Sequence, residues 1–190
     1  MGLMLSQQPD ADALLDRDPL ALVIGMVLDQ QIPLEKAFSS PYVLAERLGH
    51  VPDAAEIAAM PENDLVAIFS KPPALHRFPG SMAKRVQAMC RAVGDQYDND
   101  VARIWTGAAD GRDLLKRVGA LPGFGQQKAQ IFVALLGKQC GVEVPGWREA
   151  AGDFGPEGTY KSVADIRDAD SLARVRDYKK QLKAAAKAVG

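Results

Sequence analysis

The stretch Leu121-Pro122-Gly123-Phe124-Gly125 places two glycines, one residue apart, directly before a long apolar segment. Pro122 restricts one φ angle, whereas Gly123 and Gly125 can adopt backbone conformations closed to other residues. A tight turn of this kind exposes backbone N–H groups beside the positive end of the helix that follows. Because glycine has no Cβ, a phosphate oxygen can approach the backbone closely. The spacing therefore predicts an anion site, which suits sequence-independent binding of a nucleic-acid backbone.

Helical periodicity is present on both sides of this turn. Upstream, Leu114, Leu115 and Val118 lie on one side of a short helix that closes at Gly119. Downstream, apolar residues between Ala129 and Leu136 cover more than half of the circumference of a second helix. The sequence thus predicts a helix, a tight hairpin and a helix at about residues 110–139.

The rest of the chain also reads as helical. Asp18-Pro19 combines an N-cap residue with a proline at the first helical position, and apolar residues follow at helical spacing as far as Leu28. Pro33 ends this helix between residues 29 and 32. Similar signals predict further helices from Ser40-Pro41, from Asp53, from Asn63 or Asp64, and from Ser81 to Tyr97. With an irregular loop at 71–80 and no alternating strand pattern, we expect an all-α protein.

Composition excludes several classes of protein. The 190 residues contain 47% hydrophobic side chains, enough for a real core, yet no apolar run is long enough for a membrane span. The first twenty residues lack the pattern of a secretory signal, so we expect a cytoplasmic protein. Two cysteines and two scattered histidines predict neither a disulfide framework nor a metal site built from side chains.

Charge is distributed unevenly. The net charge of −1 does not indicate a nucleic-acid binder, but residues 174–187 carry six basic side chains against one acidic side chain. This helix-forming segment is either a solvated amphipathic helix or a face that follows phosphates. The sequence leaves both interpretations open.

Three motifs resemble one family. Residues 121–129, LPGFGQQKA, resemble the L-P-G-x-G-x-x-x-A hairpin of the helix-hairpin-helix (HhH-GPD) DNA glycosylase superfamily, which repairs damaged bases. About ninety residues upstream, LVIGMVLDQQIP is similar to the family's early helix that ends in glutamine. More weakly, Gly80 and Lys84 of FPGSMAKRV resemble a third motif on the DNA side. The chain resembles a compact bacterial member of this group.

The resemblance implies a fold and a partner. We expect two helical lobes flanking a cleft that holds an extruded base: a central helical barrel at 18–130, and a second lobe formed by 1–17 with 131–190. Duplex DNA is the expected partner, without an obligate protein partner. The hairpin would bind a monovalent cation through backbone carbonyls, as similar hairpins do. No other cofactor is expected, since two distant cysteines cannot hold the family's optional iron–sulfur cluster.

Site residues follow from the same resemblance. Gln31 is the candidate wedge that fills the gap left by the extruded base, with Gln30 and Ile32 beside it. The other expected DNA-binding residues are Gly80, Lys84, Gly123, Phe124, Gly125, Gln127 and Lys128. We expect Phe124, at the hairpin tip, not to be fully buried. We also expect a bulky residue at Gly123 or Gly125 to weaken DNA binding much more than it lowers the melting temperature.

Two catalytic positions of the family differ in this chain. Gln127 occupies the lysine position, and one step along a helix turns Lys128 by about 100°, toward Phe132 and Leu135. The aspartate position falls on Pro145. The nearby acids that remain as candidates are Glu143, Glu149 and Asp153.

Two hypotheses follow. The first is a monofunctional DNA glycosylase, without lyase activity, that hydrolyses the N-glycosidic bond of a damaged or mismatched base in duplex DNA. The second is a non-catalytic protein that recognises damaged DNA on a glycosylase scaffold.

Overall fold

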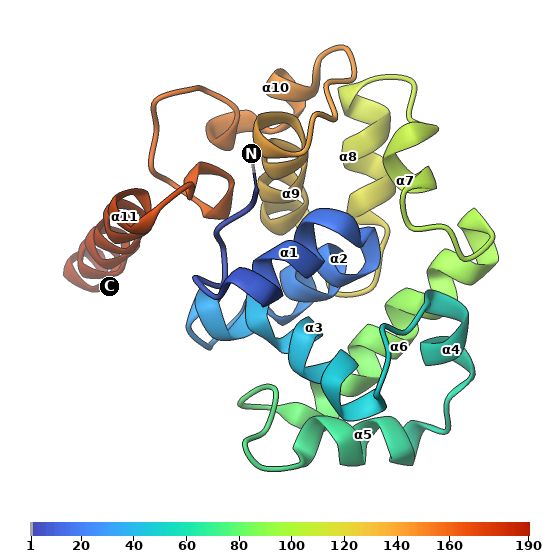
Figure 1. Ribbon diagram of the computed structural model, residues 1–190. Coiled ribbons are helices and arrows are strands. Elements are labelled where there is room, and N and C mark those ends of the chain that lie inside the picture. Colours follow the sequence, from blue (N-terminus) through green and yellow to red (C-terminus); the bar gives the residue numbers. More distant parts are fainter. Residues whose placement is uncertain (1) are drawn as a thin grey trace.

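The computed structural model describes residues 2–190 as an all-helical fold, with no strand in that range (Figure 1). The α-helices are α1 (Pro9–Arg17), α2 (Pro19–Leu28), α3 (Leu34–Leu48), α4 (Ala54–Ala59), α5 (Glu62–Ser70), α6 (Pro79–Tyr97), α7 (Arg103–Thr106), α8 (Gly111–Gly119), α9 (Gln126–Gln139), α10 (Trp147–Ala150) and α11 (Ala169–Val189). Two short 3₁₀ turns, η1 (Gly152–Phe154) and η2 (Val163–Asp165), lie between α10 and α11.

Helix α2 lies at the centre of the molecule. All residues from Leu20 to Leu28 are buried, and the Asp18 side chain caps the helix by accepting a hydrogen bond from the Leu20 N–H at 3.0 Å. Figure 1 shows α1 and α2 between a group formed by α4–α6 and a group formed by α7–α10. The helix predicted from Asp18-Pro19 is therefore confirmed as α2, and α1, α3 and α6 pack against it.

Helix α3 corrects one sequence-based expectation. The predicted start at Ser40-Pro41 is wrong, because the helix begins at Leu34 and runs through Pro41. Burial of an apolar face that includes Phe38 outweighs the main-chain hydrogen bond that Pro41 cannot make. The hydroxyl of Ser40 donates to the Lys36 carbonyl at 2.7 Å or the Leu75 carbonyl at 2.9 Å. The other predicted starts agree with α4, α5 and α6 within two residues.

The predicted helix-hairpin-helix is present as α8, residues 120–125 and α9. Asp110 caps α8 by accepting from the Asp113 N–H at 2.8 Å, and all residues of α9 from Phe132 to Gly137 are buried. Trp147 packs so closely over Gly137 that an added Cβ there would lie 2.4 Å from the indole. Helix α9 thus forms the second centre of packing.

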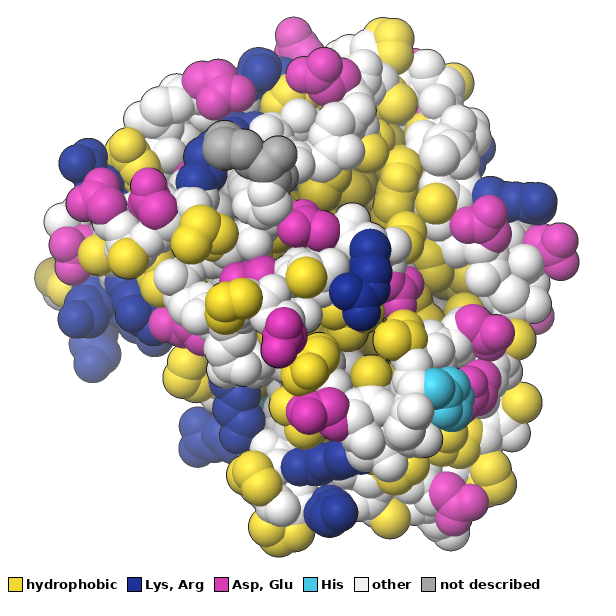
Figure 2. All heavy atoms as spheres, in the orientation of Figure 1, with side chains coloured by type: hydrophobic (Ala, Val, Ile, Leu, Met, Phe, Trp, Pro, Cys, Tyr) yellow, Lys and Arg dark blue, Asp and Glu magenta, His cyan; other side chains and the backbone are white. Residues whose placement is uncertain are grey.

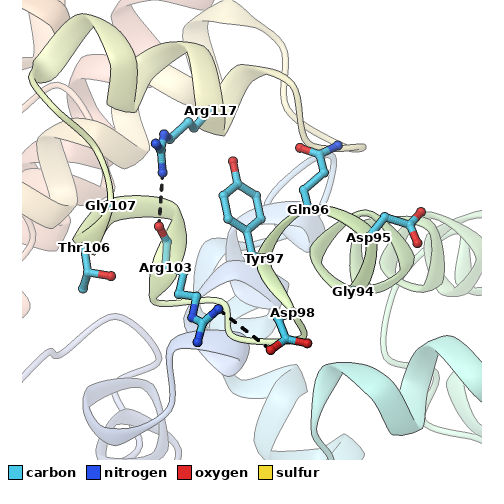
Figure 3. Close-up of a pocket in the computed structure, with 9 residues that line it drawn as sticks. All are labelled: Gly94, Asp95, Gln96, Tyr97, Asp98, Arg103, Thr106, Gly107 and Arg117. Carbon is cyan, nitrogen blue, oxygen red and sulfur yellow. Dashed lines mark hydrogen bonds and ion pairs between the residues drawn. The ribbon is translucent and has the colours of Figure 1, made fainter.

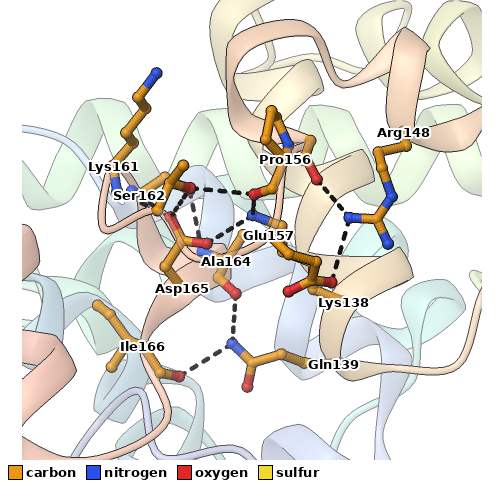
Figure 4. Close-up of polar contacts among 12 residues, drawn as sticks. Lys138, Gln139, Arg148, Pro156, Glu157, Lys161, Ser162, Ala164, Asp165 and Ile166 are labelled. Carbon is orange, nitrogen blue, oxygen red and sulfur yellow. Dashed lines mark hydrogen bonds and ion pairs between the residues drawn. The ribbon is translucent and has the colours of Figure 1, made fainter.

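The chain after α10 folds back on the end of α9 through buried polar contacts (Figure 4). The Lys138 ammonium contacts the Asp165 carboxylate at 2.6 Å and donates to the Pro156 carbonyl at 2.8 Å. The Gln139 side chain donates to the Ala164 carbonyl at 2.7 Å. These contacts fix η2, from which α11 departs.

The buried side chains, from Leu3 to Val175, form one continuous hydrophobic cluster. The division into lobes at 18–130 and at 1–17 with 131–190 stays a prediction. Among the described helices, none is long and apolar enough to cross a bilayer.

Candidate nucleic-acid interface

The two hairpin glycines play different structural roles. Gly123 has a φ of +95°, and a Cβ added there would lie 3.2 Å from both Arg85 Cδ and Val27 Cγ1. Gly125 has an ordinary φ of −85°, and an added Cβ would meet no atom of the described chain within 4 Å. Gly123 therefore serves the turn and its packing, whereas the space beside Gly125 is open to a ligand.

The start of α9 presents unpaired N–H groups. Its first main-chain hydrogen bond runs from the Ala129 N–H to the Gly125 carbonyl at 2.9 Å. The N–H groups of Gln126, Gln127 and Lys128 have no acceptor in residues 2–190. They lie at the positive end of the helix, where an anion is stabilised. The geometry is that of a phosphate-binding hairpin.

Phe124 differs from the expectation of partial exposure. Its side chain is only 7% exposed and packs on Phe132 with ring centroids 5.8 Å apart. Its N–H donates to the Leu121 carbonyl at 3.2 Å. The ring packs into the core and anchors the turn, so the expectation of partial exposure is wrong. Whether Phe124 contacts DNA stays a prediction.

A cavity of about 870 Å³ lies between the end of α2 and the first turns of α9, the helix that follows the hairpin. It lies between the end of α2, the turn that follows, the loop before α6, the start of α9, and α11. Its walls contain five of the predicted residues, Gln30, Gln31, Ile32, Gln127 and Lys128. The other lining residues are Met26, Asp29, Pro33, Arg77, Ile131, Lys179 and Lys183.

The turn after α2 is strained where the wedge is predicted. Gln31 is exposed and has a φ of +58°, a conformation uncommon for residues other than glycine. The Gln30 side chain donates to the Val27 carbonyl at 3.1 Å and accepts from Arg85 at 3.4 Å. The turn therefore presents Gln31 outward while Gln30 fastens it to α2 and α6.

His76 holds this turn from the other side. The ring is 1% exposed, and its Nε2 donates to the Leu28 carbonyl at 3.1 Å and the Gln30 carbonyl at 2.9 Å. Its Nδ1 accepts from the Phe78 N–H at 2.9 Å, so the ring is the neutral Nε2–H tautomer. Burial lowers the pKa of His76, while the bonds to Gln30 and Leu28 oppose that change. The sequence placed His76 only in an irregular loop, and no local pattern reveals its partners 46 residues away.

We expect the stability of the protein to fall as the pH decreases below about 6.5, the ordinary pKa of histidine. Because the pKa of His76 is lower in the folded state, the unfolded chain holds an extra proton between the two values. Urea unfolding measures the free energy of unfolding at each pH. For His76→Gln this free energy should change less steeply with pH than for wild type, by at most about 1.4 kcal/mol per pH unit.

The same comparison controls for His50. Its exposed ring pairs with Glu56, which raises the pKa of His50 and gives stability that is lost as the pH rises. Since both proteins retain His50, the difference between their profiles isolates His76. Identical slopes would show that His76 does not titrate on unfolding.

Lys128 lines the cavity, and its Nζ donates to the Val27 carbonyl at 3.3 Å. Because α2 ends beside the first turn of α9, both Gln127 and Lys128 lie at the same opening. Burial lowers the pKa of Lys128, and the negative charge of Asp29 opposes this effect.

Asp29 is a site residue that sequence reasoning missed. It looked like the polar end of a helix, yet its carboxyl group lines the cavity. Burial raises the pKa of Asp29, whereas Lys179 and Lys128 lower it. The only feature of the sequence that could have indicated Asp29 was its position directly before Gln30 and Gln31.

The predicted acids lie elsewhere. Glu143, Glu149 and Asp153 are exposed, and none of them lines the cavity. Pro145 and Glu149 line a separate cavity of about 510 Å³ with Arg112. The structure therefore does not bring the three acids together with the hairpin mouth and the wedge.

Gly80 and Lys84 also lie outside the cavity. Lys84 pairs with Glu62 of α5 at 3.8 Å, and the nearest neighbour to a Cβ at Gly80 is Val66 of the same helix. The next residue, Arg85, faces Gln30 and Gly123 instead. Whether Gly80 and Lys84 contact DNA stays a prediction.

The basic segment lies on α11. Figure 2 shows Lys and Arg side chains gathered over this helix, at the left of the molecule. Lys179 and Lys183 line the cavity, and Arg176 pairs with Glu35 of α3. This placement favours the phosphate-following face over a merely solvated helix.

A second cavity, of about 720 Å³, is a weaker candidate (Figure 3). It lies between the end of α6, α7 and α8, and contains none of the predicted site residues. Both arginines of this cavity form ion pairs with acidic side chains: Arg103 with Asp100 at 3.6 Å, and Arg117 with Asp113 at 3.2 Å. The cavity beside the hairpin is therefore the candidate site.

Within residues 2–190 no group of three or more His, Cys, Asp or Glu side chains is arranged to hold a metal ion. In comparisons with known proteins, residues 24–188 match the sequence model of a family described as HhH-GPD superfamily base excision DNA repair protein. No curated protein and no solved structure gives a significant match.

Proposed function

Since this chain belongs to the HhH-GPD superfamily of base excision DNA repair proteins, we propose that it is a monofunctional DNA glycosylase. It hydrolyses the N-glycosidic bond of a damaged or mismatched base in duplex DNA. The observation that carries this proposal is the cavity between the start of α9, directly after the hairpin, and the strained glutamine turn.

Each part has a physical task. The free N–H groups at the start of α9 bind a phosphate of the DNA backbone, and this contact does not depend on the base sequence. The Lys179 and Lys183 ammonium groups at the cavity edge add attraction for the DNA backbone. Extruding a nucleotide costs a few kcal/mol, and Gln31 offsets part of that cost by occupying the vacated stack. The cavity then receives the base.

The proposal excludes lyase activity. Gln127 stands at the family's lysine position, and Gln cannot form a Schiff base. Lys128 lies in the same cavity, but its Nζ donates to the Val27 carbonyl at 3.3 Å. We therefore expect base release without strand cleavage.

The test is a single-turnover assay on duplexes that contain uracil, an alkylated purine, oxidised guanine or a mismatch. Abasic products are revealed with alkali, and a second lane omits it. Release of a base that becomes visible only after alkali supports the proposal. Strand cleavage without alkali, together with borohydride trapping, would contradict the absence of lyase activity.

A second function is favoured by Pro145, which replaces the family's aspartate. On that hypothesis the chain recognises damaged DNA without chemistry. Tight binding of an abasic duplex, with no lesion processed by the wild-type protein, would select it.

Replacing Gln31 with alanine should reduce affinity for duplexes that contain a gap or an abasic site. We expect a loss of roughly tenfold, comparable to one base–side-chain stacking or hydrogen-bonding contact. Affinity for single-stranded DNA of the same sequence should not change, because a single strand has no gap to fill. Fluorescence anisotropy at one salt concentration measures both. Equal effects on the two DNAs would remove Gln31 as the wedge.

A further inference from the structure

We propose that Asp29 is the catalytic carboxylate of this cavity, and that Lys128, which lines the same cavity from α9, acts through it. This inference rests on the proposed glycosylase function and assigns the acid that the reaction needs. It places the acid before the wedge turn, at the end of α2, and not after the hairpin.

The position of Asp29 supports this assignment. Its main chain ends α2, with the N–H donating to the Met26 carbonyl at 3.3 Å, and its neighbours Gln30 and Gln31 form the turn. The side chain lines the cavity, and in residues 2–190 it has no hydrogen-bond partner. Asp29 is also the only acid among the residues that line this cavity. A partly buried carboxylate without an internal partner is available to a substrate or to water.

The charges around Asp29 favour its ionised form. Four basic residues line the same cavity as Asp29: Lys128 from α9, Lys179 and Lys183 from α11, and Arg77 from the loop before α6. Burial raises the pKa of Asp29, and Lys179 and Lys128 lower it. Burial is the larger effect, so the pKa of Asp29 is raised and its carboxylate is more basic than an exposed one.

The reaction balances with water alone. The bond between the base nitrogen and the sugar C1′ breaks, and its electron pair leaves with the base. The developing positive charge on the sugar is stabilised by the Asp29 carboxylate. A water oxygen attacks C1′, Asp29 accepts the proton of that water and returns it to solvent, and the departing base takes one proton from solvent. The products are the free base and an abasic site.

The decisive variant is Asp29→Asn, which keeps the size of the side chain and removes its basicity. We expect the single-turnover rate of base release to fall by at least about 100-fold, the usual contribution of a general base. Binding to an abasic duplex and the melting temperature should remain near wild type. Asp64→Asn, the same change at an exposed acid on α5, is the matched control and should leave all three quantities unchanged.

The outcomes separate the assignment from the function. If wild type releases a base and Asp29→Asn releases it at the same rate, the assignment is overturned while the glycosylase remains. Loss of activity in Glu143→Gln, Glu149→Gln or Asp153→Asn, with Asp29→Asn active, would overturn it in favour of that acid. If wild type releases no base from any duplex, the proposed function fails, and the assignment fails with it.

The role of Lys128 is tested by the pH profile of Lys128→Met. Without this ammonium group the ionised form of Asp29 is less stable, so its pKa rises. We expect the acid limb of the rate profile to move to higher pH, with the rate on the plateau reduced less than tenfold. An acid limb at the wild-type pH would show that Lys128 does not act through Asp29.

Discussion

Replacing Lys138 with methionine lowers the free energy of unfolding by about 3–5 kcal/mol, the usual cost of removing one partner from a buried ion pair. The Lys138 and Asp165 side chains are only 1% and 5% exposed. The Lys161 N–H contacts Asp165 at 2.8 Å, as Figure 4 shows. Without Lys138, the negative charge of Asp165 would remain buried with fewer partners. Urea denaturation followed by circular dichroism measures the change.

Two variants complete this experiment. Lys187→Met makes the same substitution at an exposed lysine of α11 and should alter stability by less than about 0.5 kcal/mol. Adding Asp165→Asn to Lys138→Met should cost less than the sum of the two single changes, because the unpaired charge is then removed. A cost below about 1 kcal/mol for Lys138→Met would mean that the pair behaves like one on the surface.

Replacing Gly125 with leucine weakens binding to duplex DNA by roughly 10- to 100-fold, equivalent to losing one or two charge-assisted hydrogen bonds to a phosphate. The melting temperature should stay within about 2 °C of wild type, because an added Cβ meets no described atom within 4 Å and φ is −85°. Anisotropy titrations at a fixed salt concentration and thermal unfolding provide the two measurements.

Gly123→Leu is the informative comparison. There φ is +95° and the added Cβ would lie 3.2 Å from Arg85 and Val27, so both binding and stability should decrease. The sequence predicted, for both glycines, a loss of DNA binding much larger than the loss of stability. With the structure, we expect this result only for Gly125. Unchanged affinity in Gly125→Leu would mean that no phosphate approaches this glycine. Equal losses of stability in both variants would mean that the two glycines serve packing alone.

Local features of the sequence predicted much of the fold. The hairpin depends on glycine spacing and on apolar periodicity, both of which act within a few residues. Pro41 was misinterpreted because a local start signal competes with burial of the α3 face, and burial is decided by α2. Phe124 was misplaced for the same reason, since its partner Phe132 is known only once α9 is in place.

The site was less predictable than the fold. Gln30, Gln31 and Lys128 were predicted through motifs and line the cavity, but the acid was sought after the hairpin, where Pro145 stands. Asp29 belongs to the site because α9 and α11 bring Lys128 and Lys179 beside it. No local pattern reports a contact between residues so far apart in the chain.

The residues that line the cavity come from distant parts of the chain, and this determines when the cavity forms during synthesis. Asp29 and Lys183, which line the same cavity, are separated by about 150 residues of chain. Because N-terminal parts fold first during synthesis, α2 and the glutamine turn leave the ribosome well before α11. A nascent chain that has reached α9 already possesses the hairpin, but one wall of its cavity is still missing. The cavity is therefore completed late in translation, once Lys179 and Lys183 of α11 have been synthesised.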